Sequence, residues 1–206
     1  MRAKHDNADD RQILENFLAT LSAKDSRLAA TGLLVEFGSI SEVLAGSWWR
    51  LRSAVGPRLA HAIVASRVVM CAALAERIAE RPLMSSSQAL LDFLRFEISF
   101  LEREQLLVIY LDHQARLIRI VRSEEGRPCQ TPIDIARIMR DGLNFGAAGF
   151  VLVHNHPSGD PRPSDADRWA TDQLRRVAAD LDMPLIDHLI VARGKIWSFS
   201  GSLHAM

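Results

Sequence analysis

The sequence predicts a protein of the α+β (α/β) class in two parts, an all-helical domain at residues 1–82 and a mixed-sheet domain at residues 83–206. In the first part, apolar residues recur at the spacing of amphipathic helices. In the second part, short apolar runs bounded by turn residues alternate with helical stretches, which is typical of a sheet with helices packed on it. Pro82 separates the two parts, because proline disfavours helix in the residue that precedes it.

The expected helices of the first part follow from apolar spacing and from capping residues. Apolar side chains at positions 13, 14, 17, 18 and 21 form the stripe of a first helix. Ser26 is expected to cap a second helix, which ends at Gly38. Ser39 or Ser41 is expected to cap a short third helix. After the segment VGPR at residues 55–58, an alanine-rich stretch predicts a long helix to about residue 81.

The second part is expected to begin with a helix capped by Ser87. Strands are predicted at residues 106–111, 116–122, 149–153, 189–192 and 195–200, and further helices at residues 132–142 and from Ser164 onward. Arg193 and Gly194 are expected to form the hairpin turn between the last two strands.

The composition describes an ordinary globular chain of 206 residues, with 48% hydrophobic and 24% charged residues and a formal net charge of zero. Global charge therefore gives no hint of binding to nucleic acid or membrane. No apolar run approaches the ~20 residues of a membrane helix, and the N-terminus is not a secretory signal. Two cysteines, Cys71 and Cys129, do not make a disulfide framework. We expect a cytoplasmic protein, whose oligomeric state is open and includes a homodimer.

The chemistry is concentrated in a stretch that begins where the run 150–153 ends in His154-Asn155-His156. Side chains two apart on a strand point to the same side, so both imidazoles can reach one point. Ser164 and Asp167 follow, which completes the pattern H-x-H-x7-S-x2-D. Two imidazoles and a carboxylate are ligands that zinc accepts at roughly 2 Å, with the fourth position left to water. The pattern predicts one catalytic zinc ion per chain, with Ser164 placed to donate to a developing oxyanion.

A structural interpretation of the same residues also holds. Ser164 and Asp167 precede an apolar-periodic stretch and match a capping box at a helix N-terminus. Such a cap would fix the position of a ligand in the first turn, so the two interpretations are compatible. The two histidines alone would be weak evidence for a metal site. The full spacing with serine and aspartate favours the metal site.

The stretch HNHPSGDPRPSDADRWAT resembles the signature of RadC-like proteins, a bacterial branch of the JAMM/MPN (JAB) metalloprotease-like superfamily. The segments FGSISEVLAGSWWRLRSAVG, ERPLMSSSQALLDFL, EQLLVIYLD and LIDHLIVARGKIWSFS are similar to other parts of that family. The resemblance implies a helix-hairpin-helix-like N-terminal domain and an MPN/JAB domain with the three-layer arrangement of cytidine deaminases. It also implies zinc-dependent hydrolysis of a peptide or isopeptide bond in a peptide or protein substrate.

The resemblance further implies a general base that takes a proton from water and later gives it to the leaving amine. Aligned on EQLLVIYLD, this residue is Glu104, with Glu102 as the second choice, although three charges together at LEREQ are also typical of a solvated strand entry. Asp187 and His188 match the family as well. Their role is either support of the metal ligands or purely structural.

The sequence departs from the family pattern in two places. The family helix before the motif strand opens with Pro-Arg-Glu, whereas this chain has Ile135, Ala136 and Arg137, which leaves the choice of substrate open. The family hairpin has Gly-x-Gly, whereas this chain has Gly56-Pro57-Arg58, which removes an amide donor for a DNA phosphate. Gly56 and Arg58 remain candidate DNA contacts, but we expect weak or no DNA binding.

Two functions follow from these observations. The first is a zinc-dependent metallopeptidase or isopeptidase. The alternative is a DNA-associated accessory protein, as the family's naming in DNA repair suggests, with a structural or vestigial zinc site. The set of three ligands favours the enzyme, because a structural zinc site would have four protein ligands.

Overall fold

The fold was analysed in a computed structural model that describes residues 7–21, 25–79, 82, 87–99, 101, 103–122, 133–193 and 195–201. The chain forms two compact units, Met1–Cys71 and Ala72–Met206. Most of the linker predicted after Pro82, together with Cys129, Glu102 and Gly194, lies outside the described residues. The α+β class is confirmed, with helices in the first unit and a five-stranded mixed sheet in the second.

The first unit is helical and has its own apolar core. It contains α1 (Asn7–Leu21), α2 (Ser26–Phe37), α3 (Ile40–Ala45) and the first part of α4 (Trp48–Ala79). Leu18, Leu33 and Ile63, from three of these helices, are completely buried in this core. The structure confirms the helix predicted from the apolar spacing at residues 13–21 and the predicted end of the second helix at Gly38.

Two capping predictions in this unit have different outcomes. Ser39 caps α3, because its hydroxyl accepts a hydrogen bond from the amide of Glu42 at 3.2 Å. The prediction for Ser26 was wrong: this residue is the first of α2, and Asp25 occupies the N-cap position without a side-chain hydrogen bond. Asp25 has a left-handed backbone, with φ 60°, whereas a residue that caps with its side chain typically has an extended one.

α4 is interrupted near its start, where Gly56 has φ 80° and ψ 168° and Pro57 follows. Glycine adopts this conformation without steric cost, and proline is well suited to the first turn of the helix that follows. Within the part of the chain that the structure describes, Trp48–Ile78 is also the one segment long and apolar enough to cross a membrane. This differs from the expectation that no stretch approaches that length. It is weak evidence, because core helices of soluble proteins pass the same test.

The second unit is built on a sheet with the strand order β2-β1-β3-β4-β5. Its strands are β1 (Leu106–Leu111), β2 (Leu117–Arg122), β3 (Gly149–Asn155), β4 (Leu185–Ala192) and β5 (Lys195–Ser198). β3 and β4 are parallel, and all other neighbouring pairs are antiparallel. The parallel pair requires a crossover, which α7 (Asp165–Asp180) provides.

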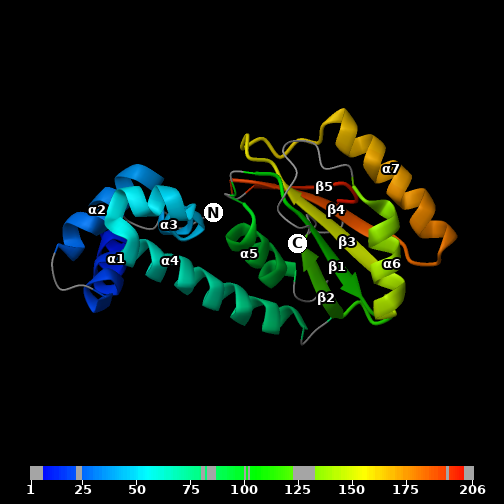
Figure 1. Ribbon diagram of the computed structural model, residues 1–206, viewed down its shortest axis with the longest axis horizontal. Helices are drawn as coiled ribbons and strands as arrows, with labels where there is room; N and C mark the ends of the chain where they lie inside the picture. The colour runs from blue at the N-terminus through cyan, green and yellow to red at the C-terminus, as the bar shows by residue number, and fades with distance from the viewer. Residues whose placement is uncertain are drawn as a thin grey trace. The chain divides into compact units, whose positions relative to one another are not determined.

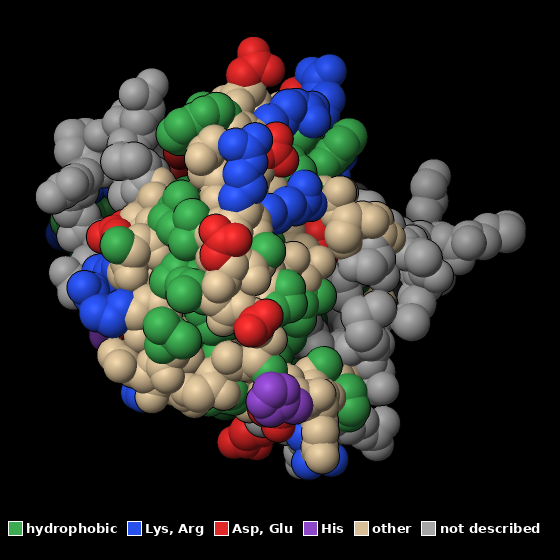
Figure 2. Space-filling model, turned by 90° about the vertical axis from the view of Figure 1, so that its right-hand side faces the viewer, with side chains coloured by type: hydrophobic (Ala, Val, Ile, Leu, Met, Phe, Trp, Pro, Cys, Tyr) green, Lys and Arg blue, Asp and Glu red, His purple; other side chains and the backbone are tan. Residues whose placement is uncertain are grey.

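Helices cover both faces of this sheet. α6 (Ile135–Phe145) and α7 lie on one face, and α5 (Ser87–Glu97) lies on the other (Figure 1). The core under α6 and α7 includes Tyr110, Phe150 and Leu174. Figure 2 shows the side of the molecule on which these helices lie, where hydrophobic side chains reach the surface among charged ones. Leu143 of α6 and Val177 of α7 are among the exposed large hydrophobic residues. The metal motif lies at the end of the central strand β3, next to the start of α7.

Several element boundaries differ from the prediction, among them the start of β2 at Leu117 and the end of β5 at Ser198. α6 continues beyond Gly142 to Phe145 and ends at Gly146, which has φ 66° and closes the helix with its amide. β3 extends to Asn155, into the histidine motif. β4 begins at Leu185, four residues earlier than expected. The polar pair Asp187 and His188 interrupts the apolar run in the sequence, but both side chains are completely buried with hydrogen-bond partners, so the strand continues through them.

Candidate metal centre

The end of β3 presents both histidines of the motif to one site. His154 is 7% exposed and His156 is partly buried, and their Nε2 atoms lie 2.9 Å apart. The side chain of Asn155 between them belongs to the opposite face of the strand. The alternation of the strand therefore brings the two imidazoles together, as the sequence predicts.

Asp167, which with His154 and His156 completes a trio of candidate ligands, is held at the start of α7. The Ser164 hydroxyl accepts from the amide of Asp167 at 3.1 Å, and Asp167 Oδ2 accepts from the amide of Ser164 at 2.7 Å. This is the predicted capping box. The Ser164 hydroxyl also donates to Asp167 Oδ2 at 2.6 Å. The cap thus fixes the carboxylate that faces the histidines.

The ionisation of Asp167 suits a ligand. Burial by itself raises the pKa of this carboxyl, but its contacts with His154 and with the hydroxyl and amide of Ser164 outweigh burial. The pKa of Asp167 therefore lies well below its usual value. The group is a carboxylate at neutral pH.

A chain of hydrogen bonds determines which nitrogen of His154 carries its proton. The Thr171 hydroxyl donates to the carbonyl oxygen of Asp167, so it accepts from His188 Nδ1, which is 2.6 Å away. Burial, the largest cause, lowers the pKa of His188 well below its usual value, so this ring is neutral and its Nε2 has a lone pair. His188 Nε2 accepts from His154 Nδ1 at 2.8 Å. In the neutral form of His154 the proton is therefore on Nδ1, and Nε2 is the nitrogen with a lone pair for a metal.

The hydrogen bond of His156 favours the same tautomer for a simpler reason. Its Nδ1 lies 2.8 Å from the carbonyl oxygen of Asp160, which can only accept a hydrogen bond. The loop holds that carbonyl in place partly through a pair between the side chains of Asp160 and Arg162. Hydrogen bonds from Arg162 lower the pKa of Asp160 to about 2. In the neutral ring, Nε2 of His156 is thus also the nitrogen with a lone pair for a metal.

These three donors converge on one point. Asp167 Oδ1 is 3.3 Å from His154 Nε2, and Asp167 Oδ2 is 3.4 Å from His156 Nε2. Ligands that bind zinc in a tetrahedron at about 2.0 Å are roughly 3.3 Å from one another. Two imidazole lone pairs and a carboxylate repel each other, and a cation would remove this repulsion. The residues therefore fit a metal ion that takes nitrogen and oxygen ligands.

His188 and Asp187 have different roles, although they are adjacent in the sequence. His188 touches the ligand His154 and stacks on Phe199 with 4.8 Å between ring centroids. Asp187 accepts hydrogen bonds from the amides of His188 and Ser200 and from the hydroxyl of Ser198. The carboxylate of Asp187 joins β4 to the segment of β5. Of the two, His188 is the one in contact with a metal-ligand candidate.

Asn155 is a residue of this site that the sequence interpretation missed. It is completely buried, and its amide nitrogen donates to the carbonyl oxygens of Leu101 and Arg103. Its side-chain oxygen accepts from the amide of Gln105 at 2.7 Å. These bonds attach the segment that carries Glu104 to the end of β3. A polar residue between two motif histidines was the available signal.

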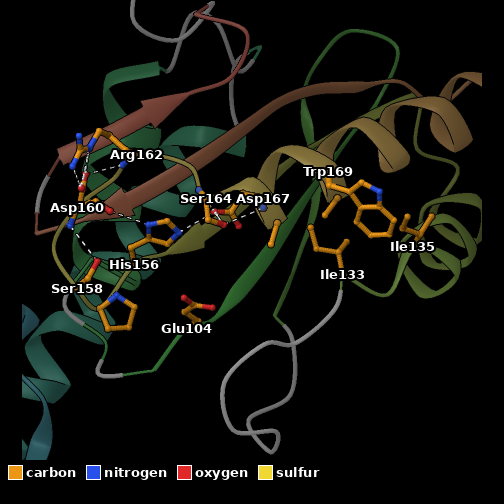
Figure 3. A pocket seen from close by; sticks show the side chains of 13 residues that line it. Glu104, Ile133, Ile135, His156, Ser158, Asp160, Arg162, Ser164, Asp167 and Trp169 are labelled. Atoms are coloured by element: carbon orange, nitrogen blue, oxygen red, sulfur yellow. Dashed lines mark hydrogen bonds and ion pairs between the residues drawn. The ribbon is translucent and has the colours of Figure 1, made fainter.

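Glu104 lies in a cleft of about 960 Å³ together with His156, Ser164 and Asp167. Its side chain is exposed, and Figure 3 shows it on the opposite side of the cleft from these residues. The structure therefore brings the predicted base, the predicted oxyanion donor and the metal motif to one cavity.

The two departures from the family pattern lie in different units. In the second unit, Ile135 lines the cleft, whereas the Arg137 side chain lies 3.7 Å from Asp141 on its own helix. In the first unit, Gly56 is at the interruption of α4, and Arg58 is exposed. Arg52 lies over the rings of Trp48 and Trp49. These ring contacts are within the unit and give no specific support for DNA binding.

Comparison with known proteins shows which family the chain resembles. Residues 84–204 match the family described as RadC-like JAB domain. A UPF0758 protein of Rhodobacter capsulatus is 36% identical over 195 residues, which cover 92% of this chain and 90% of that protein. A UPF0758 protein of Chromobacterium violaceum is 33% identical over 195 residues, covering 93% and 87%. One of Leptothrix cholodnii is 33% identical over 170 residues, covering 82% and 77%.

Proposed function

The chain belongs to the family of RadC-like JAB domains, and on this premise we propose that it is a zinc-dependent hydrolase that cleaves an amide bond in a peptide or protein. The ligands in this proposal are His154, His156 and Asp167. The observation that carries it is the convergence of two imidazole Nε2 atoms and a carboxylate at distances close to those between zinc ligands. Three protein ligands are the number found in catalytic zinc sites, which keep one position for water or substrate.

When bound, zinc would supply a Lewis acid that polarises a carbonyl and lowers the pKa of water to about 7. The carboxylate of Glu104 takes a proton from water and later gives it to the departing nitrogen. The hydroxyl of Ser164 donates to the carbonyl oxygen on which negative charge develops. In the present structure this hydroxyl donates to Asp167 Oδ2, so it must turn toward the substrate.

The function is tested by metal-dependent hydrolysis. Protein loaded with zinc is expected to cleave members of a pool of internally quenched peptides. Chelation should remove the activity, because the ligand trio without its metal has no Lewis acid, and one equivalent of zinc should restore it. The measurement is the increase in fluorescence, with mass spectrometry to identify the cleaved bonds. Cleavage that persists at the same rate after complete removal of the metal would contradict the proposal.

The buried hydrogen-bond chain gives a second prediction, which concerns zinc affinity. Thr171→Val removes the oxygen that accepts from His188 Nδ1 while keeping the volume of the side chain similar. Without this acceptor, His188 is no longer held in the tautomer that presents a lone pair to His154. Loss of such an outer hydrogen bond typically weakens metal binding about 10- to 100-fold.

Competition with a chromophoric zinc chelator measures this affinity. Thr171→Ser is the matched control, because it keeps the hydroxyl and should bind zinc as the unmodified protein does. Equal zinc affinity in the valine and serine variants would show that the chain from Thr171 to His154 does not position the ligand.

A further inference from the structure

The cleft has an apolar end that the proposed chemistry does not use. Figure 3 shows Trp169, Ile133 and Ile135 close together at one end, beyond Asp167. Asp160 and Arg162 lie at the other end, and His156 and Asp167 are between the two ends. A substrate bound at the metal centre would therefore extend toward two environments of different polarity.

Trp169 is the most prominent residue of the apolar end. Its side chain is on the second turn of α7 and remains 67% exposed. Ala166 and Ala170 also line the cleft, and residues three and four apart on a helix share one face. The small alanines leave space beside the indole ring. Tryptophan supplies a large apolar surface at low conformational cost, so its exposure here provides area for a ligand.

The isoleucines form the opposite side of this space. Ile133 and Ile135 flank the start of α6, and each is partly buried against the core of the unit. Their other surfaces line the cleft. They are therefore held by packing and present a fixed apolar wall.

The charged residues that line the cleft lie away from its apolar end. Among the described residues that line it, those with formal charge are Glu104, Asp160, Arg162 and Asp167, which are near the metal centre or at the far end. A charged side chain at the apolar end would lose water and find no partner of opposite charge among the described residues that line this end. An apolar side chain would gain free energy from the surface that it buries.

We propose that Ile133, Ile135 and Trp169 form a subsite for an apolar side chain of the peptide substrate, next to the bond that is hydrolysed. The subsite rests on the proposed function, because it selects the substrate of that same metal centre. Leucine or phenylalanine is the kind of residue that it would take. Aspartate and glutamate would be excluded.

Hydroxamates test the subsite without knowledge of the natural substrate, because the hydroxamate group binds zinc and carries a chosen side chain. The probes are N-acetylglycine, N-acetylleucine and N-acetylaspartate in which a hydroxamate replaces the α-carboxyl group. Calorimetry measures their binding to zinc-loaded protein. The leucine compound should bind at least about tenfold more tightly than the glycine compound, the effect of adding apolar groups in a fitted pocket. The aspartate compound should bind no better than the glycine compound.

Variants of Trp169 test whether the subsite causes the preference for the leucine compound. Trp169→Ala should reduce the preference for leucine over glycine severalfold, whereas Trp169→Phe should keep most of the preference. Trp49→Ala is the matched control, since Trp49 is also 67% exposed but belongs to the first unit. It should behave as the unmodified protein does.

The outcomes separate this proposal from the proposed function. Binding of all three compounds without a preference, or a preference that Trp169→Ala does not change, would overturn the subsite and leave the metal centre intact. Failure of every hydroxamate to bind zinc-loaded protein would contradict the metal centre itself, and the subsite with it.

Discussion

Purified protein supplied with zinc is expected to bind about one zinc ion per chain, and the double variant His154→Ala/His156→Ala is expected to bind none at that site. The two Nε2 atoms are the nitrogen donors of the trio, and Asp167 alone cannot replace them. Metal analysis after gel filtration measures the ratio of zinc to protein. The expected loss is essentially complete, because a single carboxylate in water holds zinc only weakly.

A second double variant controls for histidine content. His61→Ala/His113→Ala removes two exposed histidines outside the motif and should keep about one zinc ion per chain. Circular dichroism establishes that both double variants are folded. Zinc retained in full by the motif variant, or absent from the unmodified protein even with zinc in excess, would refute the metal centre.

Glu104→Gln is expected to abolish hydrolysis and to leave zinc binding unchanged. Glutamine has nearly the same shape as glutamate but cannot take up and return a proton at neutral pH. General acid–base groups contribute about a hundredfold to ten-thousandfold to the rate, so the variant should lose activity by a factor of that order. Glu104 is exposed, so this substitution has little effect on packing. The assay is the quenched-peptide cleavage, with zinc content measured on the same samples.

Glu76→Gln provides the comparison for this variant, because Glu76 is another exposed glutamate and is not among the residues that line the cleft. Its activity should equal that of the unmodified protein. Unchanged turnover in Glu104→Gln would exclude Glu104 as the base. Loss of zinc together with activity would instead indicate that the carboxylate supports the metal centre.

Much of the fold could be predicted from local patterns. The apolar stripe of α1 and the apolar runs of β1 and β3 are properties of neighbouring residues, and the structure confirms these elements. The prediction was wrong at the ends of elements, where local patterns compete with tertiary contacts. The clearest case is the start of β4, where Asp187 and His188 have the polarity of a loop but are buried with partners from other elements.

The residues of the candidate site also fall into those that local spacing identifies and those that only the fold brings close. His154 and His156 are related by the two-residue period of a strand, and Ser164 and Asp167 by a single helical turn. Both relations are local, so the motif could be identified directly. The partners of the motif are distant: His188 is 34 residues from His154, and Asn155 is 50 residues from Gln105.

The sequence by itself therefore determined which residues form the candidate metal centre, because their spacing matches the periods of the elements that hold them. Only the tertiary structure decided how those residues are supported. The parallel pairing of β3 with β4 brings His188 to His154, and the burial of Asn155 attaches the segment of Glu104 to the site. Contacts of this kind depend on which strands pair and in which register, which short-range spacing does not specify.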